Sequence, residues 1–305
     1  MRRWLLLVLA LGACVICFGC ASRPAGPAAI PAAEVPSYET IAAAWNARVE
    51  NVEPLWARST VVFEGRDAEG SDFSQLVEGH LQVIRPDRLA LSLDKLGDTY
   101  VYIGTDESSY WWFDLVDRDN RLGFIGRHES FDGDIARELG LPVEPRDLIA
   151  LLAIRPIAET MPEDVVVRWS VPEGFDRALI EVVEPRATPS GPGQRRIYLD
   201  PDWYRPLRIV LVGPDGGTVS ADLERYLDYE RAGINHLAVP GRLIITGSSF
   251  DGLIRIGLYE PQRREINPLV FDVRRLAQRF RVGELIDLDD PGVRRRLREA
   301  RAELD

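Results

Sequence analysis

The sequence predicts one mainly β domain with a few inserted helices, on three observations. From Arg58 onward, short runs of residues alternate between apolar and polar with the period of two that is typical of half-buried strands. Turn-forming phrases such as Arg85-Pro86-Asp87-Arg88 separate these runs, so consecutive strands should pair antiparallel. No stretch between residues 37 and 275 has the composition of a linker, which indicates a single domain over that range.

Two helices are expected inside this domain. Ser37 should cap a helix from Tyr38 to about Val52, because apolar residues there recur at intervals of three and four. Pro145 suits the first turn of a second helix that continues to Ile154. Thirteen candidate segments, for about twelve strands, are predicted over residues 59–64, 75–84, 89–93, 99–104, 109–115, 122–126, 165–170, 178–184, 194–199, 207–212, 218–229, 241–246 and 253–259. Residues 185–193 are expected to be loose. Residues 276–305 should form a charged, partly helical tail, whose helix from Pro291 to Asp305 is solvated or weakly docked.

Composition bounds the partners of the domain. The 305 residues are 46% hydrophobic, enough for a sizeable core, and carry a formal net charge of -11. A chain this acidic repels phosphate backbones, so nucleic acid is not an expected partner. The 3 cysteines, Cys14, Cys17 and Cys20, lie within or beside an apolar run, where thiolates are costly to form, so we predict no metal site there.

The N-terminus has the pattern of an export signal. Met1-Arg2-Arg3 is positively charged, and Trp4 to Phe18 is an apolar run of about fifteen residues, too short to span a bilayer comfortably. Because Gly19 precedes Cys20 and polar sequence follows, we predict a signal peptide over residues 1–19 and a lipidated Cys20. Leu11-Gly12-Ala13-Cys14 resembles the lipoprotein-signal consensus more closely, so Cys14 stays open as the lipidated residue, as does an uncleaved anchor or an ordinary signal.

Residues 20–36 should join the lipid to the domain, which is then taken as residues 37–275. The segment after Cys20 is rich in proline and alanine without periodicity, which is typical of a semi-extended tether. Several acyl chains would anchor the protein stably, whereas a single chain binds membranes only marginally. Ala21, rather than aspartate, follows the cysteine, which favours the outer membrane of a cell envelope, facing the periplasm.

A search for catalytic motifs indicates no enzyme and no cofactor. The sequence contains no G-x-S-x-G, H-E-x-x-H, P-loop or G-x-G-x-x-G pattern. His80, His128 and His236 stand on different predicted elements and are interpreted as ordinary surface or sheet residues. Nothing singles out Asp114 and Asp117 as a catalytic pair, and residues 287–290 lack the glycine and ligand spacing of a calcium loop.

The segment Tyr110-Trp111-Trp112-Phe113 is the most informative strand. A half-buried antiparallel strand should be polar on one face, yet this one carries large rings on both. Both faces must therefore contact something apolar. Either the protein's own helices cover the sheet, or the sheet curls around a hydrophobic cavity that holds an acyl chain.

At this point the order of elements resembles the LolA/LolB-like lipoprotein carriers of the bacterial envelope, from about Tyr38 to Phe271. The resemblance is carried by the helix before the sheet and by the aromatic hairpin around Trp111 and Trp112. It is also carried by four phrases, which are GHLQVIRPDRL at 79–89, the helix phrase at 141–152, RIYLDP at 196–201 ahead of PLRI at 206–209, and VPGRL at 239–243. These are patterns of position and not catalytic signatures.

The resemblance implies a curled, incompletely closed antiparallel sheet, or half-barrel, of about 11–12 strands, with helices covering its concave face. A hydrophobic cavity between them would take lipid chains. The alternation nominates six strand residues for the concave face and two helix residues opposite them, namely Phe63, Leu81, Leu91, Leu93, Ile103 and Phe113, with Trp45 and Leu148. Which parity points inward stays open, because a shift of one residue in register exchanges the two sets.

Two functions are weighed. In the first, a membrane-anchored protein binds a lipid, or the acyl chains of lipoproteins, for transport or membrane insertion without catalysis. Its partners are then the membrane, the acyl chains and a soluble periplasmic carrier. In the second, the same fold is a protein-docking surface without a ligand. The chain departs from the membrane-bound acceptors in its longer C-terminus and in lacking a clear exposed-leucine loop, for which residues 140–143 are the nearest candidate.

Overall fold

The computed structural model describes residues 30–50, 52–66, 70–138, 143–231, 234–248 and 250–302. Within these ranges sixteen strands form one sheet. The strands are β1 Leu55–Arg66, β2 Asp72–Ile84, β3 Arg88–Lys95, β4 Asp98–Thr105, β5 Ser109–Asp114, β6 Leu122–Arg127, β7 Val166–Ser170, β8 Leu179–Thr188, β9 Gly191–Leu199, β10 Pro206–Val212, β11 Thr218–Glu224, β12 Leu227–Arg231, β13 Ile234–Val239, β14 Arg242–Gly247, β15 Phe250–Arg263 and β16 Glu284–Asp287. The predicted signal peptide, Cys20 and Cys14 lie outside the described residues.

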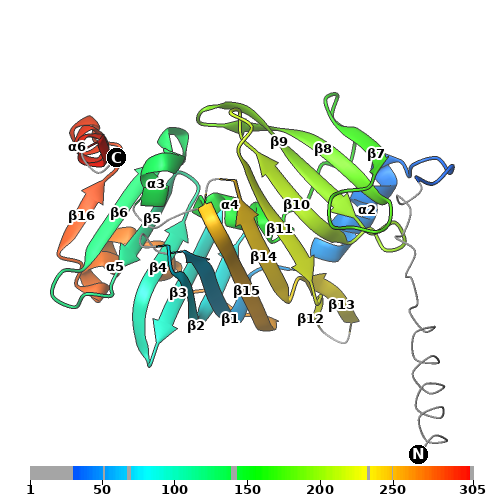
Figure 1. Ribbon diagram of the computed structural model, residues 1–305. Coiled ribbons are helices and arrows are strands. Elements are labelled where there is room, and N and C mark those ends of the chain that lie inside the picture. The colour runs from blue at the N-terminus through cyan, green and yellow to red at the C-terminus, as the bar shows by residue number, and fades with distance from the viewer. Residues whose placement is uncertain are drawn as a thin grey trace, which may run out of the picture.

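The sheet is almost wholly antiparallel and is not closed into a barrel, which confirms the predicted fold class (Figure 1). Its order is β16-β6-β5-β4-β3-β2-β1-β15-β14-β11-β10-β9-β8-β7, with β12 and β13 off this path. The first and last parts of the chain therefore meet in the middle, where β1 pairs with β15. At one edge, β16 pairs in parallel with β6, so the sheet is mixed rather than purely antiparallel.

The strand register assigns the alternating residues to faces. Leu81 is opposite Leu91, and Leu91 is opposite Ile103. Ile103 is opposite Trp112, and Tyr102 is opposite Phe113. Since side chains opposite each other share a face, the row from Leu81 to Trp112 lies on one face, here called the inner face. Tyr102 and Phe113 lie on the other, the outer face.

Two helices cover the inner face. The helix α2, Tyr38–Val49, begins at Ser37, whose hydroxyl accepts a hydrogen bond from the Thr40 amide, and it buries Ile41, Trp45 and Val49. It ends a turn earlier than predicted. The helix α4, Pro145–Leu151, has proline in its first turn as predicted and lies over β3, β4 and β5. Both helices share one hydrophobic cluster with the inner-face residues of the sheet.

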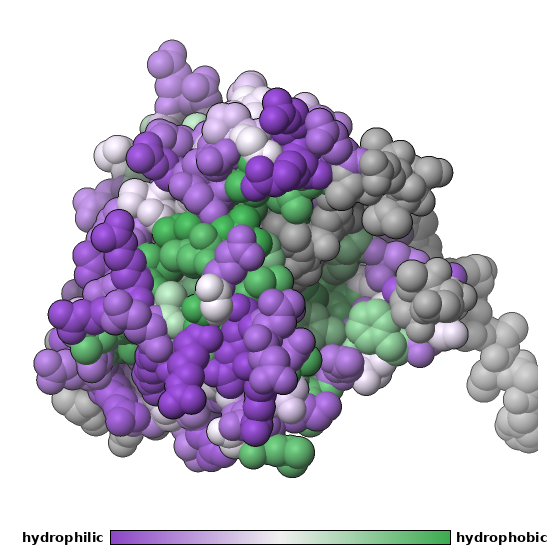
Figure 2. All heavy atoms as spheres, turned by 90° about the vertical axis from the view of Figure 1, so that its left-hand side faces the viewer, coloured by the Kyte–Doolittle hydropathy of each residue, from purple (hydrophilic) through white to green (hydrophobic). Residues whose placement is uncertain are grey.

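The C-terminal segment covers one edge of the sheet and part of each of its faces. Four short elements contribute, which are η2 Pro268–Phe271, α5 Val273–Phe280, β16 and α6 Pro291–Ala302. Phe271 and Leu276 pack with Trp111 and Phe113 on the outer face. The predicted tail helix is present as α6, and it is docked and not solvated, because its partly buried Leu297 packs against the cluster that contains Trp112 and the buried Leu288. Seen from the side that carries α6 and β16, apolar side chains gather in the centre within a hydrophilic border (Figure 2).

The rings of the aromatic strand are thus covered by the protein's own elements. Tyr110 and Trp112 pack with Ile135 of α3, Gly133–Glu138, and with Leu288. The short helix η1, His128–Ser130, connects β6 toward α3. The region expected to be loose also differs, since residues 185–193 belong to a continuous hairpin of β8 and β9 whose register runs from Ile180↔Leu199 to Thr188↔Gly191. Among the described residues, no helix has the length and apolar character needed to cross a membrane.

Candidate functional site

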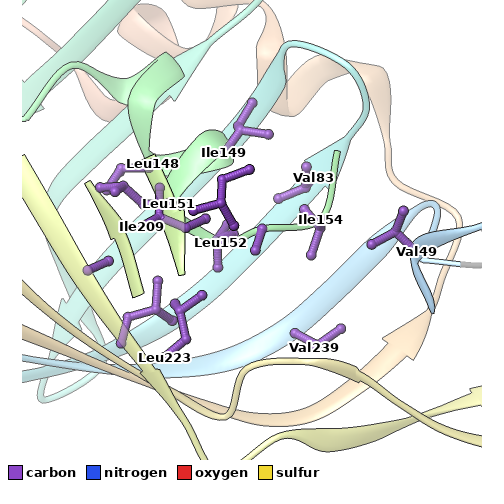
Figure 3. Packing of buried hydrophobic residues seen from close by; sticks show 14 of the residues in the cluster. Val49, Val83, Leu148, Ile149, Leu151, Leu152, Ile154, Ile209, Leu223 and Val239 are labelled. Atoms are coloured by element: carbon purple, nitrogen blue, oxygen red, sulfur yellow. The ribbon is translucent and has the colours of Figure 1, made fainter. Parts of the chain in front are cut away.

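The inner face and its two covering helices form the candidate site. On the sheet, the apolar row continues from β2–β5 through the middle strands to Leu223, Ile209 and Val182 in the other half. From the other side, Ile149, Leu151 and Ile154 of α4 and the residues after it are fully buried against this row. Figure 3 shows Leu151 and Leu152 between Ile209 and Leu223 on one side and Val83 on the other. The covered part of the inner face is packed side chain against side chain.

Polar contacts tie α2 to the segment that follows α4. The Trp45 indole Nε1 donates to the Arg155 carbonyl oxygen at 2.7 Å. Asn46 makes a reciprocal pair with Ile157, donating to its carbonyl and accepting from its amide at 2.9 Å each. Arg48 donates to the Ala153 carbonyl at 2.6 Å. Since these bonds satisfy backbone groups of residues 153–157, α2 and this segment form one connected cover.

The turn between β2 and β3 holds both ends of α4. Asp87 Oδ1 lies 3.1 Å from Arg155 Nη2, after α4, and 3.4 Å from Arg146 Nε, in its first turn. Arg85 Nη1 donates to the Ile154 carbonyl at 3.3 Å, and the same guanidinium pairs with Glu53 at 3.1 Å. Hydrogen bonds of this kind can be broken and replaced by water, unlike the interlocked apolar contacts beneath them.

The first turn of α4 also bridges the two halves of the sheet. Glu144, which precedes α4, pairs with His128 at the end of β6, with Oε1 2.7 Å from Nδ1. Asp147 in α4 pairs with Arg186 of β8. The strands β6 and β8 are each second from an edge in the strand order. These two pairs therefore draw the opposite ends of the curled sheet together across α4.

The inner face is less covered toward the end of the sheet where β1 ends and β2 and β15 begin. Phe63, Val77, Val101, Val219 and Phe250 are only partly buried there, although they pack against the main cluster. A pocket of about 540 Å³ lies at the same ends of β1, β2 and β15, lined by residues 64–66, 72–74 and 251–253. This end of the sheet is here called the open end.

An exposed leucine that the sequence reasoning missed stands at the same end. Leu96 is 97% exposed, at the tip of the β3–β4 hairpin, with a φ of 56°. Leu76 and Phe73 of β2 are 59% and 40% exposed. A signal was available, since Leu96 is the single apolar residue in the polar turn Asp94-Lys95-Leu96-Gly97-Asp98. Of the loop nominated instead, residues 140–142 lie outside the described ranges and Val143 is buried.

The structure brings most of the nominated residues together. Phe63, Leu81, Leu91, Leu93 and Ile103 contribute to one cluster with Trp45 of α2 and Leu148 of α4. Phe113 does not, and its nomination for the concave face is corrected, because it lies opposite Tyr102 and packs with α5 on the outer face. The β4–β5 turn places Trp112, not Phe113, in the inner row. Contact of any of these residues with a ligand remains a prediction.

Asp114, Asp117 and His80, which were considered for chemistry, have structural partners. The Asp114 and Asp117 carboxylates each accept a backbone amide two residues further along, at 3.1 and 2.9 Å, as turn-forming aspartates do. His80 lies on β2 with its Nδ1 3.9 Å from Asp94, and His236 lies on β13. In the ranges that the structure describes, no three His, Cys, Asp or Glu side chains are grouped to hold a metal ion.

Comparison with known proteins finds similarity only among solved structures. No family model matches the chain, and no curated protein matches it. A DUF1329 family protein from Desulfovibrio piger aligns with a TM-score of 0.50 and 9% identity, over 78% of this chain and 97% of that one. A putative outer membrane lipoprotein-sorting protein domain from Vibrio parahaemolyticus aligns with a TM-score of 0.48 and 13% identity, over 78% of this chain and 97% of that one. A LolA superfamily protein from Nitrosomonas europaea aligns with a TM-score of 0.46 and 10% identity, over 78% of this chain and 98% of that one. At these identities the likeness concerns the fold alone, and of these three alignments the one with the Desulfovibrio piger DUF1329 family protein reaches a TM-score of 0.50.

Proposed function

We propose that this protein is a membrane-anchored lipoprotein of the bacterial envelope that binds lipid, or the acyl chains of lipoproteins, on its inner face and passes them on without covalent chemistry. One observation carries the proposal. The inner face is a continuous apolar surface that is packed under α2 and α4 but only partly covered at its open end. A chain entering there would extend inward as the helices yield.

The energy of binding would come from apolar burial. Each methylene removed from water contributes about 0.8 kcal/mol, so ten methylenes supply roughly 8 kcal/mol. Against this stands the loss of the contacts that Ile149, Leu151 and Ile154 make with the sheet. The ligand and α4 would bury the same apolar surface of the sheet. Replacing α4 by the ligand therefore conserves much of the apolar contact, so binding would be reversible and of moderate affinity.

The tether suits an anchor near the domain. The Trp169 indole of β7 donates to the Ala33 carbonyl at 3.0 Å, and Val35 packs against the main cluster, so the tether is docked before α2 begins. With Cys20 lipidated, the thirteen residues from there to Ala33 span at most roughly 45 Å. The domain would then stay within reach of the membrane that holds the lipid, which we take to be the outer membrane, facing the periplasm.

Leu96 would contact that membrane. A leucine side chain moved from water into the bilayer gains roughly 1.5–3 kcal/mol. Because Leu96 lies near the open end, its insertion would place the pocket beside Phe73 and Gly252 against the lipid surface. Acyl chains could then pass between the protein and the membrane without exposure to water. A soluble periplasmic carrier is the proposed donor of such chains.

The test is native mass spectrometry with lipid extraction on the full chain purified from its own envelope. We expect bound lipid or acylated peptide in the wild type and its loss in Phe63→Asp, which places a charge on the inner face near the open end. Val62→Asp is the matched control, because the neighbouring residue points to the outer face and is half-buried as well. An apo mass without uptake of added lipid would contradict the proposal and leave a protein-docking surface on this fold. Equal loss in both variants would contradict the assignment of the inner face.

A further inference from the structure

The first turn of α4 carries a buried ionic group that the lipid-binding proposal does not use. His128 and Glu144 are each 6% exposed, and Thr105 and the Asp106 carbonyl are further polar contacts of the His128 ring. Ion pairs placed this deep contribute little net stability, since desolvation offsets their attraction. Their position is specific, because they join β6 to α4 while Asp147 and Arg186 join α4 to β8. The four residues His128, Glu144, Asp147 and Arg186 are here called the clasp.

The hydrogen bonds around His128 suit a doubly protonated ring. Nδ1 faces Glu144 Oε1 at 2.7 Å, and an ionised carboxylate can only accept. Nε2 faces the Asp106 carbonyl at 3.0 Å and Thr105 Oγ1 at 2.9 Å. An imidazolium donates on both sides, whereas a neutral ring protonated at Nδ1 keeps the bond to Glu144 and accepts from the Thr105 hydroxyl. The two forms therefore differ in the charge that faces Glu144.

We propose that the clasp is a proton-dependent closure of the curled sheet, which holds α4 over the inner face when His128 is protonated and releases it when the proton is lost. A neutral imidazole removes the positive charge that faces Glu144, and an ionised carboxylate left buried without a counter-charge is costly. The least costly relief is for α4 to move and let water reach Glu144. The consequence for lipid binding rests on the proposed function, whereas the closure itself does not.

Two groups of the clasp have shifted pKa values, and further charges lie around them. Burial lowers the pKa of His128, but its bonds to Glu144 and to the Asp106 carbonyl outweigh this, so the pKa is raised overall. Burial raises the pKa of Asp147 to about 6, against the lowering effect of Arg186. The other charged or titratable groups nearby are Arg127 and Glu129 beside His128, Asp106 and Glu107 in the β4–β5 turn, Tyr110 of β5, Arg146 of α4, and Asp289 and Arg294, which bond Ser130. Asp132 and Asp134 at the start of α3 and Asp215 after β10 line one pocket with Glu144, Asp147 and Arg186.

Both shifts act in the same direction. A group whose pKa is raised in the closed form stabilises that form at low pH, and the contribution is lost as the pH rises through the raised value. The stabilisation of the closed form by protonated Asp147 is lost as the pH rises from about 4 to 6. The stabilisation by protonated His128 is lost as the pH rises above the ordinary pKa of histidine, 6.5. Proton uptake therefore closes the clasp, and a rise to pH 8 loosens it.

The test is hydrogen–deuterium exchange of the full chain in detergent micelles, at pH 5 and pH 8, with each rate divided by its intrinsic rate at that pH. We expect protection of amides 148–154 to fall at least about tenfold at pH 8, because one pKa unit is a factor of ten. In His128→Gln with Asp147→Asn the fall should disappear. His80→Gln is the matched control and should behave as the wild type, since His80 lies on β2 away from α4. Equal protection at both pH values in the wild type would overturn the proposal.

A second measurement does not depend on the variants folding. Because the chain has 3 histidines, the imidazole 15N signals of the wild type can be resolved and assigned. We expect both nitrogens of His128 to be protonated at pH 6.5, and a single-proton tautomer at pH 5 would contradict the clasp. Neither experiment contains lipid. A protein that passes both tests but takes up no lipid would refute the proposed function and leave the closure standing.

Discussion

Weakening α4 should tighten lipid binding, which is the opposite of what damage to an ordinary binding wall would do. Leu151 is fully buried between α4 and the inner face. Leu→Ala substitutions at such sites cost about 2–5 kcal/mol. If α4 is the cover, Leu151→Ala destabilises the closed form, in which the leucine is packed. It leaves the stability of the open form, which binds the ligand, nearly unchanged.

The magnitude follows from the population of the open form. Apparent affinity is the intrinsic affinity multiplied by the fraction of protein that is open, so it rises as that fraction rises. A shift of 2 kcal/mol corresponds to roughly a 30-fold increase, and the gain ends when the open form predominates. We expect at least about a tenfold lower Kd for a dansyl-labelled long-chain fatty acid, titrated into the full chain held in amphipol.

Leu276→Ala supplies the matched control. Leu276 of α5 is 2% exposed and belongs to the outer-face cluster, so the same atoms are removed from an equally buried site on the other side of the sheet. Its thermal stability should fall by a similar amount while its fatty-acid affinity stays unchanged. An unchanged or weaker affinity in Leu151→Ala, or equal gains in both variants, would refute the reasoning that α4 covers the binding surface.

Three further predictions concern other parts of the molecule. Leu96→Asp should leave the melting temperature within error, because the side chain is 97% exposed. It should also abolish the blue shift of an environment-sensitive dye attached at an adjacent Lys95→Cys thiol when vesicles are added; an unaffected shift would exclude Leu96 from the membrane contact. Phe113→Leu should lower the unfolding free energy by about 1 kcal/mol without changing lipid uptake, since the ring is fully buried on the outer face, and reduced uptake would return Phe113 to the inner face. Removing residues 284–305 should expose Trp112 and Phe124, which Leu288 and Leu297 now cover, so the shortened chain should bind a hydrophobic dye and melt lower; an unaltered melting curve would show that β16 and α6 are dispensable for stability.

Several helices and strands could be predicted from the sequence because the patterns that indicate them extend over only a few residues. The helix at Tyr38, the proline-started helix at Pro145 and most of the strands follow from period, caps and turn residues, which act over a few positions. The hairpin of β8 and β9 was missed because proline and glycine in residues 185–193 mimic a loop. Its strands are held instead by pairing across the hairpin as far as Thr188 and Gly191.

Only part of the candidate site could be predicted from the sequence. Five of the six nominated strand residues share the inner face, because the alternation within each strand was interpreted correctly. Phe113 was placed wrongly because the β4–β5 turn sets the register between the strands, and no pattern within either strand reports it. Leu96 was missed because an isolated leucine in a turn has no period.

What the sequence determined by itself is the amount and spacing of apolar residues, and hence an antiparallel sheet with helices packed on it. The tertiary structure alone decided which face each row joins, that the C-terminal segment completes the sheet at β16 and covers part of each face, and that His128 meets Glu144 while Asp147 meets Arg186. The physical reason is range. Propensity and periodicity act over a few residues, whereas His128 and Arg186 are brought to the same helix only by the curl of the whole sheet between β6 and β8.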